Sequence, residues 1–205
     1  MTDLHQAPDA PGRVLLLRHG ETEWSASGRH TGRTDIPLTE RGRERAQESG
    51  ELGVKLLGGR RPALVLASPR VRARTTAELA GLHVDRVDDR LAEWDYGNYE
   101  GLTTPQIRET APGWTVWTQP VPGGETPAQV QARADALLAD VTAVLPRGDV
   151  VLVGHAHFSR VLTARWIALP ATEGVRFAMD PAAWTVLGHE RGVPRCTHVN
   201  LSVLW

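Results

Sequence analysis

Two arginines and two histidines of this chain lie beside apolar segments that resemble strands of a parallel sheet. Arg18 and His19 end the first segment, Arg70 follows the second, and His155 directly follows the fourth. Ligands of such sheets bind outside the carboxyl ends of the strands, so we expect these four side chains to meet in one pocket. Guanidinium groups match the oxygens of a phosphoryl group, and a neutral imidazole can attack phosphorus. The pattern therefore favours phosphoryl transfer onto a histidine.

The elements that must position these residues alternate between strands and helices. Apolar or alternating runs predict strands over residues 13–18, 63–67, 82–87, 149–154, 184–190 and 196–204. Helical spacing predicts helices over residues 40–57, 70–80, 126–145 and 157–169. This order predicts an α/β fold, a three-layer α/β/α sandwich whose central sheet is mostly parallel. Residues 1–12 are expected to form a flexible lead-in, and residues 13–205 a single domain.

Residues 88–124 have a different character and are predicted to form an ordered, aromatic-rich excursion over the active site, a lid or insertion. A short helix is expected near residues 104–110. The aromatic residues of the excursion are Trp94, Tyr96, Tyr99, Trp114 and Trp117. Two interpretations stay open for Trp114 and Trp117, which either stack on a sugar or aryl group or pack the excursion onto the sheet.

The composition favours a small anionic ligand over a macromolecule. The formal net charge is −1, which gives no bulk attraction to nucleic acid or to an anionic membrane. The single cysteine, Cys196, excludes an intramolecular disulfide. The first residues lack the pattern of a signal peptide, and no apolar run is long enough for a membrane span. We therefore expect a cytoplasmic protein whose partner is a small phosphorylated metabolite.

Five stretches in order along the chain carry a family resemblance. They are residues 16–24 with Arg18-His19-Gly20, residues 31–42, residues 68–77 with Ser68-Pro69-Arg70, residues 91–101, and Gly154-His155. With these stretches the chain resembles the histidine phosphatase superfamily, which includes phosphoglycerate mutases and many acid phosphatases. The resemblance spans about residues 13–165 and implies a phosphomonoester hydrolase that needs no cofactor and no metal. A homodimer is common among such relatives.

The resemblance implies a role for each matching residue. His19 would be the nucleophile that becomes phosphohistidine. Arg18, Arg70 and His155 would bind the phosphoryl group and stabilise its transition state. Glu93 would protonate the leaving oxygen and later activate water. Fixed cations can stabilise phosphoryl transfer without a metal, so these roles agree with the chemistry of the residues.

Further residues are expected near the substrate. Thr31 and Gly32 match a stretch whose backbone contacts substrate in relatives. Ser25 stands where the mutases usually have an asparagine, and it is a substrate-binding candidate. Glu21 either faces the substrate or has a structural role. His157 either lines the mouth of the pocket or begins a helix.

Three expectations concern neighbours of these residues. Burial beside Trp94 is expected to keep the Glu93 carboxyl protonated, so that it can donate its proton. Arg72 and Arg74, on the helix after Arg70, are assigned to ordinary surface ion pairs. Gly20 is expected to let the backbone approach the substrate closely.

Alternative functions differ in the sequence features they require. A mutase of this superfamily uses a longer insertion with added basic residues. Here only 30 positions separate Glu93 from Gly123, and Arg108 is the one basic residue among them. Hydrolysis is therefore favoured over phosphoglycerate mutase activity, and the aromatic pattern resembles sedoheptulose-bisphosphatase-type enzymes and actinobacterial broad-specificity acid phosphatases. A metallohydrolase that uses His155 and His157 as ligands and a non-catalytic phospholigand-binding protein are the rivals from other classes.

Overall fold

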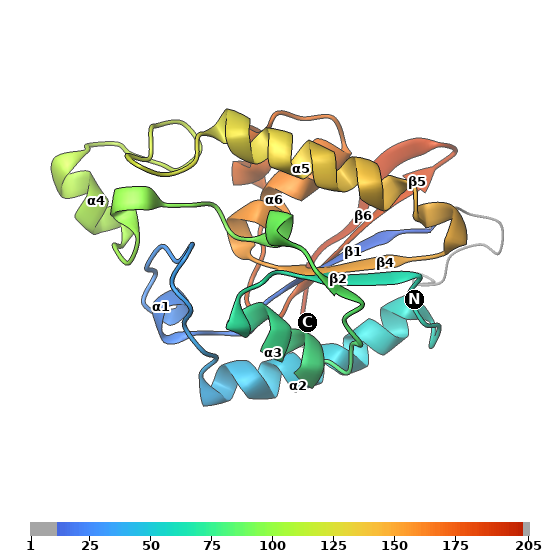
Figure 1. The fold of residues 1–205 in the computed structure, drawn as a ribbon. Helices are drawn as coiled ribbons and strands as arrows, with labels where there is room; N and C mark the ends of the chain where they lie inside the picture. Colours follow the sequence, from blue (N-terminus) through green and yellow to red (C-terminus); the bar gives the residue numbers. More distant parts are fainter. Residues whose placement is uncertain (1–11, 203–205) are drawn as a thin grey trace.

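The computed structural model describes residues 12–202, which form a six-stranded sheet between two layers of helices (Figure 1). The strands are β1 (Val14–Arg18), β2 (Leu64–Ala67), β3 (Arg86–Val87), β4 (Val150–Gly154), β5 (Trp184–Glu190) and β6 (Val193–Leu201). They lie in the order β3-β2-β4-β1-β5-β6. The pairs β3–β2, β2–β4 and β4–β1 are parallel, whereas β1–β5 and β5–β6 are antiparallel. The predicted α/β fold with a mostly parallel sheet is confirmed.

The register of the three central strands aligns their carboxyl ends. Arg18 at the end of β1 lies opposite Gly154 at the end of β4. Ala67 at the end of β2 lies opposite Val153, one residue earlier in β4. Because parallel strands with level ends release their following residues at one edge, this register brings the residues after β1, β2 and β4 together.

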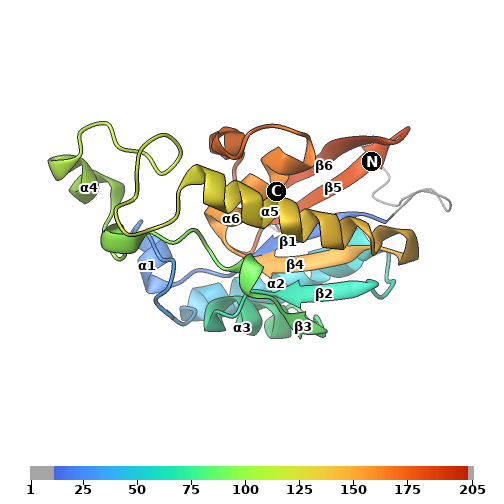
Figure 2. The same cartoon turned by 45° about the horizontal axis from the view of Figure 1, so that its top comes forward.

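Alternate residues of the central strands face different helix layers. Val14 and Leu16 pack in the cluster that contains α5 (Pro127–Thr142) and α6 (Ala156–Trp166), whereas Leu15 and Leu17 pack in the cluster that contains α2 (Glu40–Leu57) and α3 (Val71–Leu79). Figures 1 and 2 show the two helix pairs on opposite faces of the sheet. Burial on both faces explains why the sequences of β1 and β4 are continuously apolar.

Several boundaries differ from the predictions for local reasons. The strand predicted over 82–87 is reduced to Arg86–Val87, and both residues are exposed at the edge of the sheet. Helix α5 begins after Thr126, which forms the predicted capping box with Gln129, but it ends at Thr142. Helix α1 (Glu23–Ala26) was not predicted, although Thr22 and Ser25 form a capping box at its start. The lead-in at 1–11 and the end of the last predicted strand lie outside the described residues.

The excursion over 88–124 contains short helical elements. They are the 3-10 helices η1 (Asp89–Leu91) and η2 (Gly97–Tyr99) and the helix α4 (Thr104–Thr110), which has the predicted bounds. Figures 1 and 2 place α1 and α4 beyond the carboxyl ends of β1 and β4. Trp114 and Trp117 are buried in the same core cluster as α5 and α6, in agreement with the packing interpretation of these two indoles.

No helix within residues 12–202 is both long and apolar enough to cross a lipid bilayer.

Candidate active site

His19 lies directly after β1 with only 5% of its surface exposed. Its Nδ1 is 2.7 Å from the carbonyl oxygen of Gly20. A carbonyl only accepts hydrogen bonds, so Nδ1 carries the proton and Nε2 keeps its lone pair. Burial, followed by the charges of Arg18 and Arg72, holds the pKa of His19 well below its ordinary value. The imidazole is therefore neutral near pH 7, with Nε2 available as a nucleophile.

Gly20 is required by packing against the start of α2. A Cβ at this position would lie 2.3 Å from the carbonyl oxygen of Gly42. The Gly20 N–H also donates to Oγ1 of Thr76 at 2.9 Å. This glycine therefore fixes the backbone that holds His19, and the crowding comes from α2. The expected close approach of substrate to the Gly20 backbone stays a prediction.

His155 lies directly after β4 and is fully buried. Its ring contacts that of His19 edge to face, with 5.2 Å between centroids. Its Nε2 is 2.7 Å from Oγ of Ser68, and its buried Nδ1 has no hydrogen-bond partner within the described residues. Burial lowers its pKa first, and neighbouring arginines lower it further. A second neutral imidazole therefore stands beside the nucleophile.

Arg18 and Arg70 bring positive charge to the same edge of the sheet. Arg18 donates from Nη1 to the carbonyl of Met179 at 2.6 Å, and its buried Nε has no partner within residues 12–202. Arg70 donates from Nε to the carbonyl of Gly32 at 3.2 Å. Buried donors normally have acceptors, so the unpaired Nε of Arg18, a residue that lines the cavity described below, is available to an anion such as a phosphoryl group.

Arg72 corrects the prediction of a surface ion pair. Its side chain is fully buried and donates to the carbonyls of Thr34 at 2.9 Å and Thr31 at 3.0 Å. The guanidinium thus joins α3 to the backbone of the 31–34 loop. Arg74, two residues further along α3, is exposed, as expected for the opposite side of a helix.

The 31–34 loop is held from its other side by Glu100 of the excursion. The N–H groups of Gly32, Arg33 and Thr34 all donate to the Glu100 carboxylate at 2.9 to 3.1 Å. The backbone of Gly32 is thus committed to contacts inside the protein, and its predicted contact with substrate stays a prediction. Thr31 lines the pocket described below.

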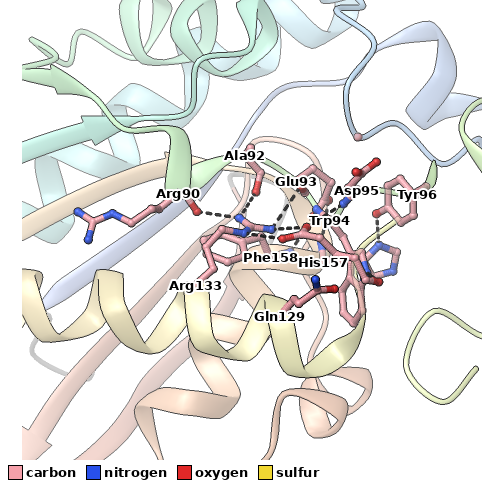
Figure 3. Close-up of polar contacts among 12 residues, drawn as sticks. Arg90, Ala92, Glu93, Trp94, Asp95, Tyr96, Gln129, Arg133, His157 and Phe158 are labelled. Carbon is pink, nitrogen blue, oxygen red and sulfur yellow. Dashed lines mark hydrogen bonds and ion pairs between the residues drawn. The ribbon is translucent and has the colours of Figure 1, made fainter. Parts of the chain in front are cut away.

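Glu93 joins the excursion to the first turn of α6 (Figure 3). Its Oε1 accepts from the N–H groups of Trp94 at 2.9 Å and Phe158 at 2.8 Å, and its Oε2 accepts from His157 N–H at 2.9 Å. These contacts satisfy backbone donors at the N-terminus of α6 that have no partner within the helix. Protonation by burial beside Trp94 stays a prediction. Arg133 holds the segment by donating to the carbonyl of Ala92 at 2.7 Å.

Uncharged ring groups surround the mouth of the site. The hydroxyl of Tyr96 is 2.5 Å from Nδ1 of His157, and Nε2 of His30 is 3.1 Å from Oγ1 of Thr104. Burial lowers the pKa of His30 to about 4 and that of His157 well below its ordinary value. Tyr96 was absent from the predicted site. Its position three residues after Glu93 was the available signal, but an aromatic residue at that spacing equally suits a core.

A cavity of about 150 Å³ lies beside the nucleophile, and neither Arg70 nor His155 is among its lining residues. It is lined by Arg18, His19, Ser25, Gly28, Arg29, His30, Thr31, Glu93, Tyr96, Ala156 and His157. Glu21 does not line it, and its carboxylate instead accepts from the hydroxyl of Thr39 at the start of α2, which is the structural alternative. A larger cavity of about 330 Å³ lies between α2, β2 and residues 80–83, which follow α3, and it is lined by none of the predicted catalytic residues.

The alternative of a metallohydrolase requires several metal-binding side chains close together. Within residues 12–202, no group of three or more His, Cys, Asp or Glu side chains is placed to hold a metal ion. His155 and His157 contact different hydroxyls, those of Ser68 and Tyr96.

Comparisons with known proteins agree with this geometry. A family model described as the histidine phosphatase superfamily (branch 1) matches residues 14–202. The chain is 50% identical to an acid phosphatase of Mycobacterium tuberculosis over 190 residues, which cover 93% of each protein. It is 32% identical to a sedoheptulose 1,7-bisphosphatase of Saccharomyces cerevisiae over 190 residues, 79% of this chain and 70% of that protein.

Solved structures show the same fold. The structure of an open reading frame of Mycobacterium tuberculosis superposes with a TM-score of 0.89 at 49% identity, covering 93% of this chain and 98% of that one. A mycobacterial glucosyl-3-phosphoglycerate phosphatase solved with VO3 gives a TM-score of 0.80 at 35% identity, covering 93% and 100%.

Proposed function

Because this chain belongs to the histidine phosphatase superfamily (branch 1) and is a phosphatase of phosphomonoesters, we propose that Nε2 of His19 is the atom that receives the phosphoryl group. The hydrogen bond between His19 Nδ1 and the Gly20 carbonyl carries this proposal. It fixes the tautomer in which Nε2 holds a lone pair, and the lowered pKa keeps that lone pair free near neutral pH.

The first chemical step moves the phosphoryl group to the enzyme. A bond forms between Nε2 of His19 and phosphorus while the ester P–O bond breaks, and the leaving oxygen takes a proton from Glu93. Arg18, Arg70 and His155 bind the non-bridging oxygens as their charge is redistributed. Their donors are held in place before the reaction begins, which is the condition for electrostatic stabilisation of the transition state.

The second step returns the enzyme to its starting state. Water attacks phosphorus, the N–P bond breaks, and the proton lost by water goes to the Glu93 carboxylate. Inorganic phosphate leaves, and Glu93 is again protonated for the next cycle. A carboxyl that lines the same cavity as the nucleophile is in the right place for both proton transfers.

The substrate class proposed is a small phosphorylated metabolite such as a sugar phosphate, accepted with broad specificity. Ser25, Thr31 and His157 line the cavity with uncharged hydrogen-bonding groups, which suit the hydroxyls of a sugar. Relatives of this chain act on sedoheptulose 1,7-bisphosphate and on glucosyl-3-phosphoglycerate, as their names state. The excursion over 88–124 would serve as a lid, because it supplies Glu93 to the cavity.

Hydrolysis is favoured over mutase activity by the contacts of Arg108. This basic residue of the excursion donates from Nε to the carbonyl of Trp114 at 2.9 Å. It is also not among the residues that line the cavity, so it is not placed to bind the carboxylate of a phosphoglycerate there. The homodimer and the cytoplasmic location expected from the sequence stay predictions.

Phosphate release from a panel of phosphomonoesters in EDTA tests the proposed nucleophile. The panel includes sugar monophosphates, sugar bisphosphates and 3-phosphoglycerate. We expect wild-type enzyme and the exposed-histidine control His83→Ala to release phosphate, and His19→Ala to release none. Rapid quenching should trap a phosphoenzyme that is stable to alkali and labile to acid in the wild type and in His83→Ala, but not in His19→Ala. Release by His19→Ala at the wild-type rate would overturn the proposal.

A further inference from the structure

The side chain of Ser68 joins two parts of the proposed phosphoryl site. Ser68 is fully buried directly after β2. Its Oγ is 2.7 Å from Nε2 of His155, and it accepts from the N–H of Arg70 at 3.3 Å. The backbone N–H of Ser68 is also fixed, because it donates to the carbonyl of Val153 in β4 at 2.9 Å. The hydroxyl thus has a fixed position against the imidazole.

The two ring nitrogens of a neutral imidazole have opposite roles, since one carries the proton and the other a lone pair. His155 is fully buried among arginines, which disfavours the charged imidazolium. Which nitrogen is protonated therefore decides whether Nδ1, the nitrogen left for a ligand, donates to a phosphoryl oxygen or repels it.

The hydrogen-bond partners of the Ser68 hydroxyl determine which ring nitrogen of His155 carries the proton. The N–H of Arg70 can only donate to Oγ, so the hydroxyl proton needs an acceptor elsewhere. Within the described residues, the hydrogen bonds of this hydroxyl connect it to no acceptor except Nε2 of His155. If Nε2 carried the proton, the buried hydroxyl would keep a hydrogen without an acceptor, which costs free energy. The arrangement that satisfies both groups has the Ser68 hydroxyl donating to a bare Nε2.

We propose that Ser68 is a positioning residue that keeps the proton of His155 on Nδ1, so that this nitrogen donates a hydrogen bond to the phosphoryl group. The proposal rests on the proposed function, because it takes His155 as a ligand of the phosphoryl oxygens. It explains why the buried Nδ1 of His155 has no partner among residues 12–202. The missing acceptor is the oxygen that the substrate brings.

Nuclear magnetic resonance of the wild-type enzyme tests the tautomer directly. Long-range ¹H–¹⁵N correlations of histidine-labelled protein distinguish a protonated ring nitrogen from a bare one. The His155 signals are assigned by their loss in His155→Gln. We expect Nδ1 to be protonated and Nε2 bare, with and without saturating inorganic phosphate. A wild-type spectrum with the proton on Nε2 would overturn the proposal, and this result needs no variant to fold.

Kinetics test whether Ser68 acts through His155. We expect Ser68→Ala to lower kcat/KM by about tenfold and to populate the other tautomer. His155→Ala removes the donor altogether and should cost about 10²–10³-fold. In the double variant, Ser68→Ala should add less than about twofold to the loss caused by His155→Ala. A tenfold loss in both backgrounds would show that the hydroxyl acts independently of His155 and would overturn the proposal.

Ser49→Ala is the matched control for removal of a buried hydroxyl. Ser49 lies on α2, is 1% exposed, and its Oγ has no hydrogen-bond partner within residues 12–202. Its removal should leave kcat/KM within about twofold of the wild type and the His155 tautomer unchanged. Failure of the proposed function can be distinguished from failure of the proposal for Ser68. Full activity of His155→Ala would show that His155 does not bind the phosphoryl group, whatever tautomer the spectrum reports.

Discussion

Replacement of Arg72 separates two contributions of one buried side chain, its hydrogen bonds and its charge. The guanidinium donates to the carbonyls of Thr31 and Thr34, and its charge is among the causes that lower the pKa of both His19 and His155. Arg72→Lys keeps the charge but loses the planar fork. Arg72→Met loses both.

The expected loss of stability follows from the two carbonyls. Each buried polar group left without a partner costs about 1–3 kcal/mol, so Arg72→Met should lower the free energy of unfolding by about 2–6 kcal/mol, and Arg72→Lys, whose ammonium can still donate to one carbonyl, should lower it less. An exposed arginine in an ordinary ion pair would change it by about 0.5 kcal/mol or less. Urea unfolding at neutral pH, followed by tryptophan fluorescence, measures the difference.

The expected effect on the pH profile distinguishes the two variants. Arg72 lowers the pKa of His19, so removal of its charge raises that pKa. The nucleophile is the neutral imidazole, so the acid limb of kcat/KM should move to higher pH in Arg72→Met. It should stay near its wild-type position in Arg72→Lys, which keeps a cation. An unfolding free energy within about 0.5 kcal/mol of the wild type, together with an unmoved acid limb in Arg72→Met, would refute this account of Arg72.

Two further substitutions test the acid and the backbone around the nucleophile. Glu93→Gln should lower kcat/KM by about 10²–10³-fold for sugar phosphates but by less than about tenfold for p-nitrophenyl phosphate, whose leaving oxygen needs no proton; equal losses for both would count against the proposed acid. Gly20→Ala should lower activity at least tenfold and destabilise the protein by about 1–3 kcal/mol, because the added Cβ would clash with the carbonyl oxygen of Gly42 in α2. Gly188→Ala is its control, because a Cβ at Gly188 makes only ordinary contacts. Equal losses of activity and of thermal stability in the two variants would contradict the argument that a clash with α2 excludes a side chain at Gly20.

The parts of the fold that the sequence predicted are those set by local pattern. The apolar runs of β1 and β4 and the capping box at Thr126 are local signals, and the two strands and the start of α5 lie where they were expected. The level carboxyl ends of parallel strands then bring Arg18 and His155 to one site without further information. This part of the architecture follows from short segments of sequence and a general rule of α/β sheets.

The parts that the sequence did not predict depend on partners distant along the chain. Arg72 has the same residue type and almost the same local context as Arg74, but only Arg72 faces the 31–34 loop. A side chain at Gly20 is excluded by the carbonyl of Gly42, a contact that the sequence around Gly20 does not reveal. The sequence pattern of one helix or one turn does not show which distant loop will pack against it.

The contacts of Glu93 impose a condition on every interpretation of its substitution. Helix α6 begins after His155, and the Glu93 carboxylate accepts the N–H groups of the next turn. The proposed acid therefore also holds the helix that follows a proposed ligand of the phosphoryl group. Loss of this carboxylate would shift His155 as well as remove a proton donor. A displaced phosphoryl ligand slows every substrate alike, whereas a missing acid slows only those with poor leaving groups. Only the comparison of two leaving groups separates these effects, since a single rate constant would report their product.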